Sequence, residues 1–216
     1  MKRLLGLLLT MMLLVSLCSC SGDTEIRGEI STTPSNEPDF SLGKTENNRY
    51  RNDYLGISCT LPSDWVFYTD EQILEINNIA LDSFEGNIAE AIKNAPILYD
   101  MYATNPNDLS STNINMEKLS AIQLLTLDLK ANLESQFPAL KTSFANMGYT
   151  NVQIAYQKVT VDGKEYDGMR ATAQIQGIDF YTVSFCVKKG SYLVSINVTS
   201  FQTDKTATLL SYFSVS

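Results

Sequence analysis

The sequence predicts an α+β domain in which an antiparallel sheet is covered by helices, and three observations lead to that prediction. The last third alternates apolar and polar residues in four stretches separated by turns at Asp162-Gly163, Gln176-Gly177 and Lys189-Gly190. Between residues 122 and 147, apolar residues recur every three or four positions, the period of an amphipathic helix. Shorter strand-like and helix-like stretches come before it. Strands and helices in this order are typical of an α+β fold.

The N-terminus has the pattern of an export signal. The basic start Met1 to Arg3 is followed by an apolar run, Leu4 to Leu17, that is too short for a comfortable transmembrane helix. The next residues, Leu17-Cys18-Ser19-Cys20, resemble the bacterial lipobox, whose cysteine receives a diacylglyceryl group before cleavage. Cys20 fits that position better than Cys18, which would follow the bulky Leu17. We therefore expect residues 1–19 to be a lipoprotein signal peptide and Cys20 to be the lipid attachment site. The alternative is an ordinary cleaved signal with an accidental cysteine pair.

Residues 20–48 are predicted to be a lipidated cysteine followed by a disordered tether, because they contain few large apolar residues and many Ser, Thr, Asn, Pro and charged residues. Residues 49–216 are long enough for one domain with its own core. Cleavage at Cys20 removes two of the 16 basic residues and none of the 24 acidic ones, so the net charge falls from −8 to −10. Such a chain is a poor partner for nucleic acid. The same charge predicts that the domain stands off from an anionic membrane surface.

The first part of the domain is predicted to contain short strands and two helices. The predicted strands are Tyr50 paired with Tyr54 to Leu61 around a turn near Asn52-Asp53, and Trp65 to Tyr68. Thr69 and Gln72 have the spacing of a capping box, which predicts a helix with Ile73 and Ile76 on one face. A second helix is expected over residues 84–94, and strands over 97–103 and 114–119.

The later part is predicted to contain a long helix, the four-strand meander and a final helix. The helix runs from Ile122 to Met147 with a kink or break at Pro138 and a C-terminal cap at Gly148. The first meander strand changes phase between Tyr156 and Val159, so a β-bulge is expected near Gln157-Lys158. The final helix is expected over residues 204–213.

These elements resemble a known fold family. The start YRNDYLGISCTLPSDW, the run ILYDMYAT, the long helix and the closing meander look like the PsbP-like α/β/α sandwich. That superfamily includes the photosystem extrinsic protein and the Ran-binding Mog protein, and small lipoproteins of anaerobic gut bacteria carry the same start and meander. The resemblance covers residues 49–216 and implies a binding or accessory scaffold. It brings no catalytic residues with it.

Several chemistries are disfavoured by the residues that the sequence lacks. There is no histidine, which removes Ser-His-Asp and Cys-His nucleophile systems and most zinc or copper sites. No glycine-rich nucleotide loop is present. Ser41 and Lys44 have the S-x-x-K spacing of some serine enzymes but lack the companion motifs, so we interpret them as coincidence. We expect no catalytic residue, no cofactor and no metal site.

Three groups of residues are weaker candidates for function. Glycoside hydrolysis needs a carboxylate pair, and six acids are candidates for it: Asp64, Asp70, Glu71, Glu75, Glu85 and Glu90. The loop from Asn105 to Asn113 offers oxygen ligands for calcium but lacks the spacing of an EF-hand, so a plain turn is favoured. Aromatic residues that would line a ligand groove, or else simply pack on helices, are Tyr99, Tyr102, Tyr156, Tyr166, Tyr181 and Tyr192. Whether Cys59 and Cys186 form a disulfide is left open.

The resulting expectation is a lipid-anchored module on the extracytoplasmic face of a bacterial cell membrane. It binds an unknown protein or envelope component, contacts the membrane through its lipid anchor and has no catalytic activity. The first alternative is a small-ligand capture lipoprotein with a pocket between sheet and helices. The second is a carboxylate-dependent hydrolase, which requires a close acidic pair facing one cleft.

Overall fold

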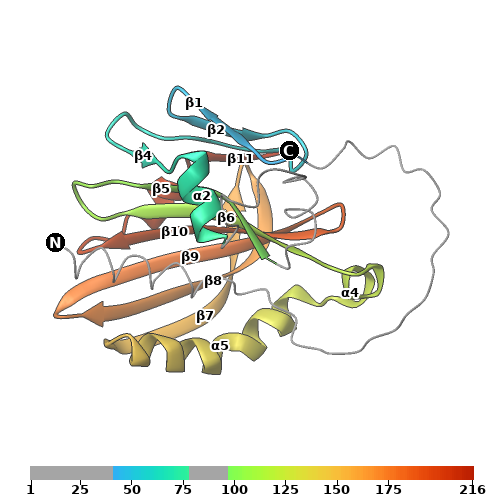
Figure 1. The fold of residues 1–216 in the computed structure, drawn as a ribbon. Coiled ribbons are helices and arrows are strands. Elements are labelled where there is room, and N and C mark those ends of the chain that lie inside the picture. The colour runs from blue at the N-terminus through green and yellow to red at the C-terminus, as the bar shows by residue number, and fades with distance from the viewer. Residues whose placement is uncertain (1–40, 78–96) are drawn as a thin grey trace, which may run out of the picture.

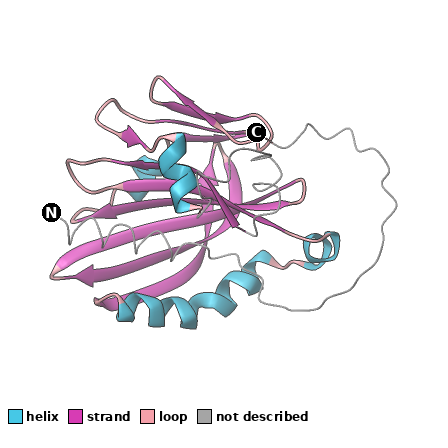
Figure 2. Cartoon of the chain, viewed as in Figure 1, coloured by secondary structure: helices cyan, strands magenta, loops and turns pink. Residues whose placement is uncertain are grey.

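The computed structural model describes residues 41–77 and 97–216, which form two antiparallel sheets packed face to face (Figures 1 and 2). The smaller sheet has the order β1 (Lys44–Glu46), β2 (Arg49–Asn52), β3 (Ile57–Thr60), β11 (Phe213–Val215). The larger sheet has the order β4 (Val66–Phe67), β5 (Ile97–Thr104), β6 (Ser111–Lys118), β10 (Tyr192–Phe201), β9 (Ile178–Lys189), β8 (Lys164–Ile175), β7 (Tyr149–Val161). The α+β class and the C-terminal meander β7 to β10 are confirmed.

The helices are α2 (Asp70–Ile76), α4 (Ala121–Thr126), α5 (Leu129–Asn146) and α6 (Thr206–Leu210). The longest, α5, lies along β7 and β8 at the β7 edge of the large sheet (Figure 1). Its Leu140 and Phe144 pack on Met169 and Ala171 of β8. Helix α2 lies against β5, where Ile73 meets Tyr102. The helix expected over residues 84–94 lies outside the described residues.

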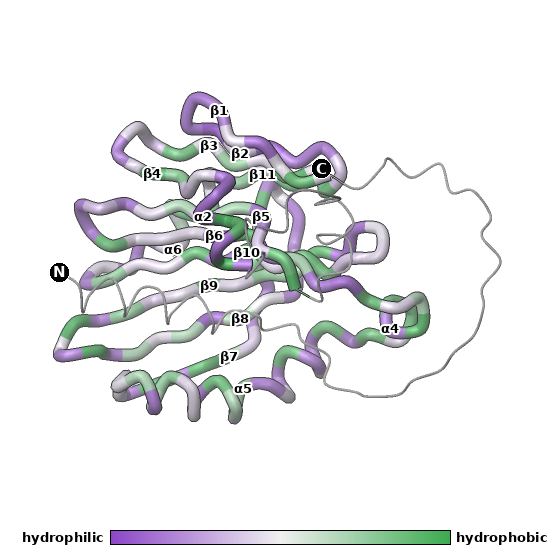
Figure 3. Tube along the Cα trace, in the orientation of Figure 1, coloured by the Kyte–Doolittle hydropathy of each residue, from purple (hydrophilic) through white to green (hydrophobic). Residues whose placement is uncertain are grey.

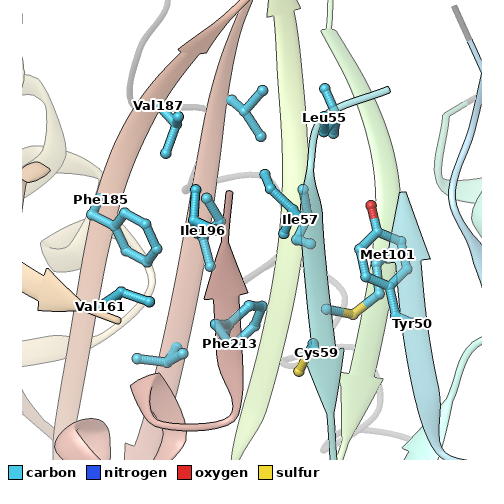
Figure 4. Close-up of a cluster of buried hydrophobic side chains, with 14 of the residues drawn as sticks. Tyr50, Leu55, Ile57, Cys59, Met101, Val161, Phe185, Val187, Ile196 and Phe213 are labelled. Carbon is cyan, nitrogen blue, oxygen red and sulfur yellow. The ribbon is translucent and has the colours of Figure 1, made fainter. Parts of the chain in front are cut away.

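The main core lies between the two sheets. Tyr50, Ile57, Cys59 and Phe213 from the small sheet meet large-sheet residues such as Phe185 in one buried cluster (Figure 4). The other face of the large sheet packs against helices. The layer order is therefore small sheet, large sheet, helices. The small sheet covers one face of the large sheet, and the helices pack on its opposite face.

Several local predictions are confirmed. Thr69 and Gln72 form the capping box of α2: the Gln72 amide donates to Thr69 Oγ1 and the Thr69 amide donates to Gln72 Oε1 at 2.9 Å. Asp162-Gly163 and Gln176-Gly177 have φ values between 50° and 80°, as tight hairpin turns require. Gly148 ends α5 with φ 86°.

The first meander strand needs no bulge at Gln157-Lys158. The pairing of β7 with β8 is continuous there, and the register shift lies instead between Thr150 and Gln153. The phase change has another cause. Ile154 and Tyr156 pack on the helix side, whereas Val159 and Val161 enter the core between the sheets. One regular strand therefore passes from one packing environment to another.

The long helix breaks at a different residue from the one expected. Leu127 has extended backbone and Asp128 caps a new helix by accepting a hydrogen bond from the Ala131 amide at 3.1 Å. Helix α5 then continues through Pro138. Pro138 and Glu134 are both exposed, so water can satisfy the Glu134 carbonyl that loses its donor.

Three element boundaries also differ from the sequence prediction. The folded part begins before Arg49, because β1 pairs with β2. Strand β6 begins at Ser111 rather than Ile114. The final helix stops at Leu210, and Phe213 begins β11, which pairs with β3 near the start of the domain. The pattern of Leu209, Leu210 and Phe213 did not reveal that return to the sheet.

Candidate functional site

The acids considered for hydrolysis have structural roles where the structure describes them. Asp64 accepts a hydrogen bond from Asn105 Nδ2 at 2.8 Å, which ties two loops together. Asp70 and Glu71 occupy the first turn of α2, where the helix dipole favours negative charge. A hydrogen bond from Thr69 lowers the pKa of Glu71. Glu85 and Glu90 lie outside the described residues. Within residues 41–77 and 97–216, no group of three or more Cys, Asp or Glu side chains is arranged to hold a metal.

The loop after β5 is a turn whose side-chain oxygens accept hydrogen bonds from its own backbone and from Lys205. Asn105 Oδ1 accepts from the Asn107 amide, and Asp108 Oδ1 accepts from the Ser110 amide, both at 2.9 Å. Lys205 pairs with the second oxygen of Asp108 at 2.5 Å. These contacts support the interpretation as a turn.

The tyrosines do not gather in one groove. Tyr99 and Tyr102 lie on strand β5, and Tyr102 packs beside α2. Tyr166 and Tyr192 belong to the core between the sheets, on the opposite side of the large sheet. The cysteines are divided in the same way. Cys59 lies between the sheets and Cys186 on the helix side, so both thiols are buried and no disulfide joins them.

The most unusual polar group in the described part is the buried carboxylate of Asp100. A bulge in β5 between Tyr99 and Met101 turns this side chain toward the small sheet. Its oxygens accept hydrogen bonds from Tyr50 Oη at 2.5 Å, Asn52 Nδ2 at 2.7 Å and the Gly43 amide at 2.8 Å. We call these four residues the Asp100 clasp. The clasp joins the large sheet to β2 and to the segment that leads into β1.

The electrostatics of the clasp reflect burial without a cation. Burial raises the pKa of Asp100, and the hydrogen bonds from Tyr50, Gly43 and Asn52 act in the opposite direction. Burial also raises the pKa of Tyr50, so its hydroxyl stays protonated and donates. Asn52 in addition donates to the Ser41 carbonyl at 3.1 Å. The clasp therefore fixes the position at which the preceding chain joins the domain.

The outer face of the small sheet is polar and open. Strand β2 alternates, with Arg49 and Arg51 exposed and Tyr50 and Asn52 buried. The register places Lys44, Arg51, Ser58 and Ser214 side by side across all four strands. Figure 3 shows β1 and β2 as a hydrophilic region of the chain. We call this surface, with its lining Lys44, Arg49, Arg51, Ser58 and Ser214, the outer face.

The outer face contains a shallow open hollow of about 170 Å³, lined by Arg49, Arg51, Ser58, Ser214 and Ser216 among others. Arg51 pairs with Asp53. Lys44 and Arg49 form no ion pair with any other residue that the structure describes. Their charges are therefore directed at solvent.

A second polar surface is buried on the helix side of the large sheet. Cross-strand register aligns Tyr102, Asn113, Asn197 and Ser184 in one row across β5, β6, β10 and β9. Asn197 Nδ2 donates to Asn113 Oδ1 at 2.9 Å. Asn197 Oδ1 and Ser184 Oγ are buried and have no hydrogen-bond partner among residues 41–77 and 97–216. Buried polar atoms are nearly always paired, so these two require an explanation.

Sequence reasoning missed both the clasp and the outer face. The signal for Asp100 was an acid inside the apolar run ILYDMYAT. The signal for the outer face was the alternation Arg-Tyr-Arg-Asn, which separates charged from buried positions. Cys20 lies outside the described residues. In the part of the chain that the structure describes, no helix is long and apolar enough to cross a membrane.

Comparison with known proteins gives weak likeness to solved structures and no match of other kinds. No protein-family model matches the sequence, and no curated protein matches it. Among solved structures, the chain is similar to LpqN, described as involved in cell envelope biogenesis of Mycobacterium tuberculosis. The identity is 12%, the match covers 71% of this chain and 75% of LpqN, and the TM-score is 0.37. A likeness at that level carries no functional argument.

Proposed function

We propose that this protein is a bacterial lipoprotein, anchored through Cys20 on the extracytoplasmic face of the membrane, whose domain binds another envelope component without catalysing a reaction. The observation that carries the proposal is the sequence Leu17-Cys18-Ser19-Cys20 directly after a basic start and an apolar run. The clasp supports it, because it holds the chain that arrives from the anchor in a fixed position. The PsbP-like resemblance is compatible with a binding scaffold and belongs to the same proposal.

The anchor is tested by replacing Cys20 with Ser in the full chain, with Cys18→Ser as the matched control. The wild-type protein and the control are expected in the membrane fraction with a covalent acyl label. The Cys20→Ser protein is expected to lack the label and to leave the membrane. A label that persists in Cys20→Ser and disappears in Cys18→Ser would show that Cys18 is the lipid attachment site. A label absent from all three proteins would refute the lipoprotein assignment.

A second candidate function is the capture of a small ligand on the helix side of the large sheet. The specific observation in its favour is that two buried atoms, the acceptor Asn197 Oδ1 and the hydroxyl Ser184 Oγ, have no hydrogen-bond partner in the described part of the chain. No charged side chain lies in their row, so the ligand would be neutral and would supply hydrogen-bond donors. A neutral sugar or amide that raises the melting temperature of the wild type, but not of Ser184→Ala, would support this function.

A further inference from the structure

The outer face combines exposed cations with the point at which the N-terminal chain joins the domain. Lys44 follows directly after Gly43, whose amide is held by Asp100. Lys44 lies opposite Arg51 in the β1–β2 register, and Arg49 lies opposite Thr60 of β3. The chain between Cys20 and Gly43 reaches at most about 80 Å when fully extended. Any anchor at Cys20 therefore keeps this face within about 80 Å of the membrane.

We propose that the outer face binds the phosphate headgroups of anionic phospholipids in the membrane that holds the anchor. This inference rests on the proposed function, because the anchor supplies the proximity. Lys44 and Arg49 are the contact cations, since neither is committed to an ion pair within the described residues. Arg51 adds a third cation, partly neutralised by Asp53. The hydroxyl of Ser58, aligned beside Arg51, offers a hydrogen bond to phosphate.

Charge distribution explains how an acidic protein can contact an anionic surface. The net charge of −8 describes the whole chain and predicts repulsion. Electrostatic interactions are screened within about 8 Å at physiological salt, so only the nearest charges determine the contact. On and beside the outer face these are Lys44, Arg49 and Arg51, with Lys164 and Lys189 next to β11, against Glu46, Asp53 and Asp162. Orientations that bring the other acids within that distance of the membrane are repelled, so the domain turns this face toward it.

A weak contact is sufficient because the anchor makes it intramolecular. Each Lys or Arg near an anionic bilayer contributes a factor of about five in association. The tether expected from the sequence would, at this length, give an effective concentration in the millimolar range. The headgroup contact therefore sets the orientation of the domain and is not required for membrane attachment.

The test uses the acylated full chain reconstituted in vesicles. A donor fluorophore on Thr60→Cys, opposite Arg49, reports energy transfer to acceptors at the lipid headgroups. Cys59 and Cys186 are buried, so labelling is confined to the introduced thiol. Transfer is expected to be higher in mixed phosphatidylcholine–phosphatidylglycerol vesicles than in phosphatidylcholine alone. High salt or the double variant Lys44→Gln, Arg49→Gln should return it to the phosphatidylcholine level. The control Lys141→Gln, on the exposed side of α5, should leave it unchanged.

The outcomes separate this proposal from the proposed function. Equal transfer in both vesicle types, or a loss of transfer in Lys141→Gln as large as in the double variant, would overturn it. Flotation with phosphatidylcholine vesicles tests lipid anchoring independently of any contact with anionic headgroups. If the protein does not float, the anchor fails, and the unacylated chain is then mixed with the anionic vesicles. Salt-sensitive flotation that falls about 25-fold in the double variant would still support the headgroup site. Binding to soluble polyphosphate but not to vesicles would overturn the membrane as its partner.

Discussion

Replacing Tyr50 with Phe tests the Asp100 clasp with the smallest change of shape. Tyr50 is fully buried, and its hydroxyl donates to Asp100 Oδ2 at 2.5 Å. A hydrogen bond to a buried charged group contributes about 1.5–3 kcal/mol. We therefore expect the free energy of unfolding at pH 7 to fall by about 2 kcal/mol. For a domain of this size, that loss lowers the melting temperature by about 4–8 °C.

The cost of Tyr50→Phe is expected to depend on pH. Burial holds the pKa of Asp100 above its unfolded value, and the Tyr50 hydroxyl acts against that rise. A carboxyl whose folded pKa is raised stabilises the fold fully below its unfolded pKa, near pH 4, and loses that contribution as the pH rises through the folded pKa. Without Tyr50 the folded pKa rises further, so more stability is lost. The cost of the substitution should be smaller near pH 4 than at pH 7.

The assay is urea unfolding followed by the fluorescence of Trp65, the single tryptophan of the chain. Wild type, Tyr50→Phe and a control, Tyr212→Phe, are compared at both pH values. Tyr212 is only partly buried and its ring packs against the core, so its substitution should cost little. A Tyr50→Phe cost below about 0.5 kcal/mol at pH 7 would show that the hydroxyl contributes no more than an ordinary surface group. An equal cost at both pH values would refute the role assigned to the carboxylate charge.

Three further predictions concern the packing between strands, the thiols and the cationic face. A Cβ on Gly168 would lie 2.4 Å from the backbone oxygen of Ser184, so Gly168→Ala should force β8 and β9 apart. The expected loss in the free energy of unfolding, measured by thermal unfolding, is about 1–3 kcal/mol. In the control Gly177→Ala the new Cβ meets no atom within 4 Å, so only the strain of the positive φ is expected, about 1–2 kcal/mol. Burial raises the pKa of the Cys59 thiol, so Cys59 should react with a thiol reagent in urea but not in the native protein, and fast native labelling would contradict its burial. Arg49→Gln should change the free energy of unfolding measured in urea by less than about 0.5 kcal/mol, because its side chain is exposed.

The sequence was most informative where structure depends on neighbouring residues. Turns need backbone conformations that few residue types tolerate, so Asp162-Gly163 and Gln176-Gly177 were found at their observed positions. The capping box at Thr69 was predicted for the same reason, since the two bonds link residues three positions apart. The break before α5 also had a local signal, because Asp128 is a favoured cap. The prediction instead placed the kink or break at Pro138, because proline lacks a backbone N–H.

Long-range pairing could not be predicted from these signals. Residues 213–215 join β3, more than 150 positions earlier, and their apolar residues fit a helix end as well as a strand. The second sheet was missed for the same reason, because its strands have only three or four residues, too few to reveal which strands pair. The Asp100 clasp depends on both. Its bulge lies in β5, its donors lie near β1 and β2, and only the packing of the two sheets brings them together.

Strand β2 links the clasp to the outer face, and this link makes the two proposals separable. In Arg49-Tyr50-Arg51-Asn52 the strand period directs alternate side chains to opposite faces. The inward pair donates to Asp100 and contributes to the core, whereas the outward pair faces solvent beside Lys44. Substitutions at Tyr50 should therefore lower stability and leave headgroup contact intact in the protein that remains folded. Substitutions at Arg49 should weaken headgroup contact without affecting stability. If both kinds of variant changed both quantities equally, the two faces of β2 would not be independent, and membrane contact would depend on the integrity of the whole sheet rather than on its exposed cations.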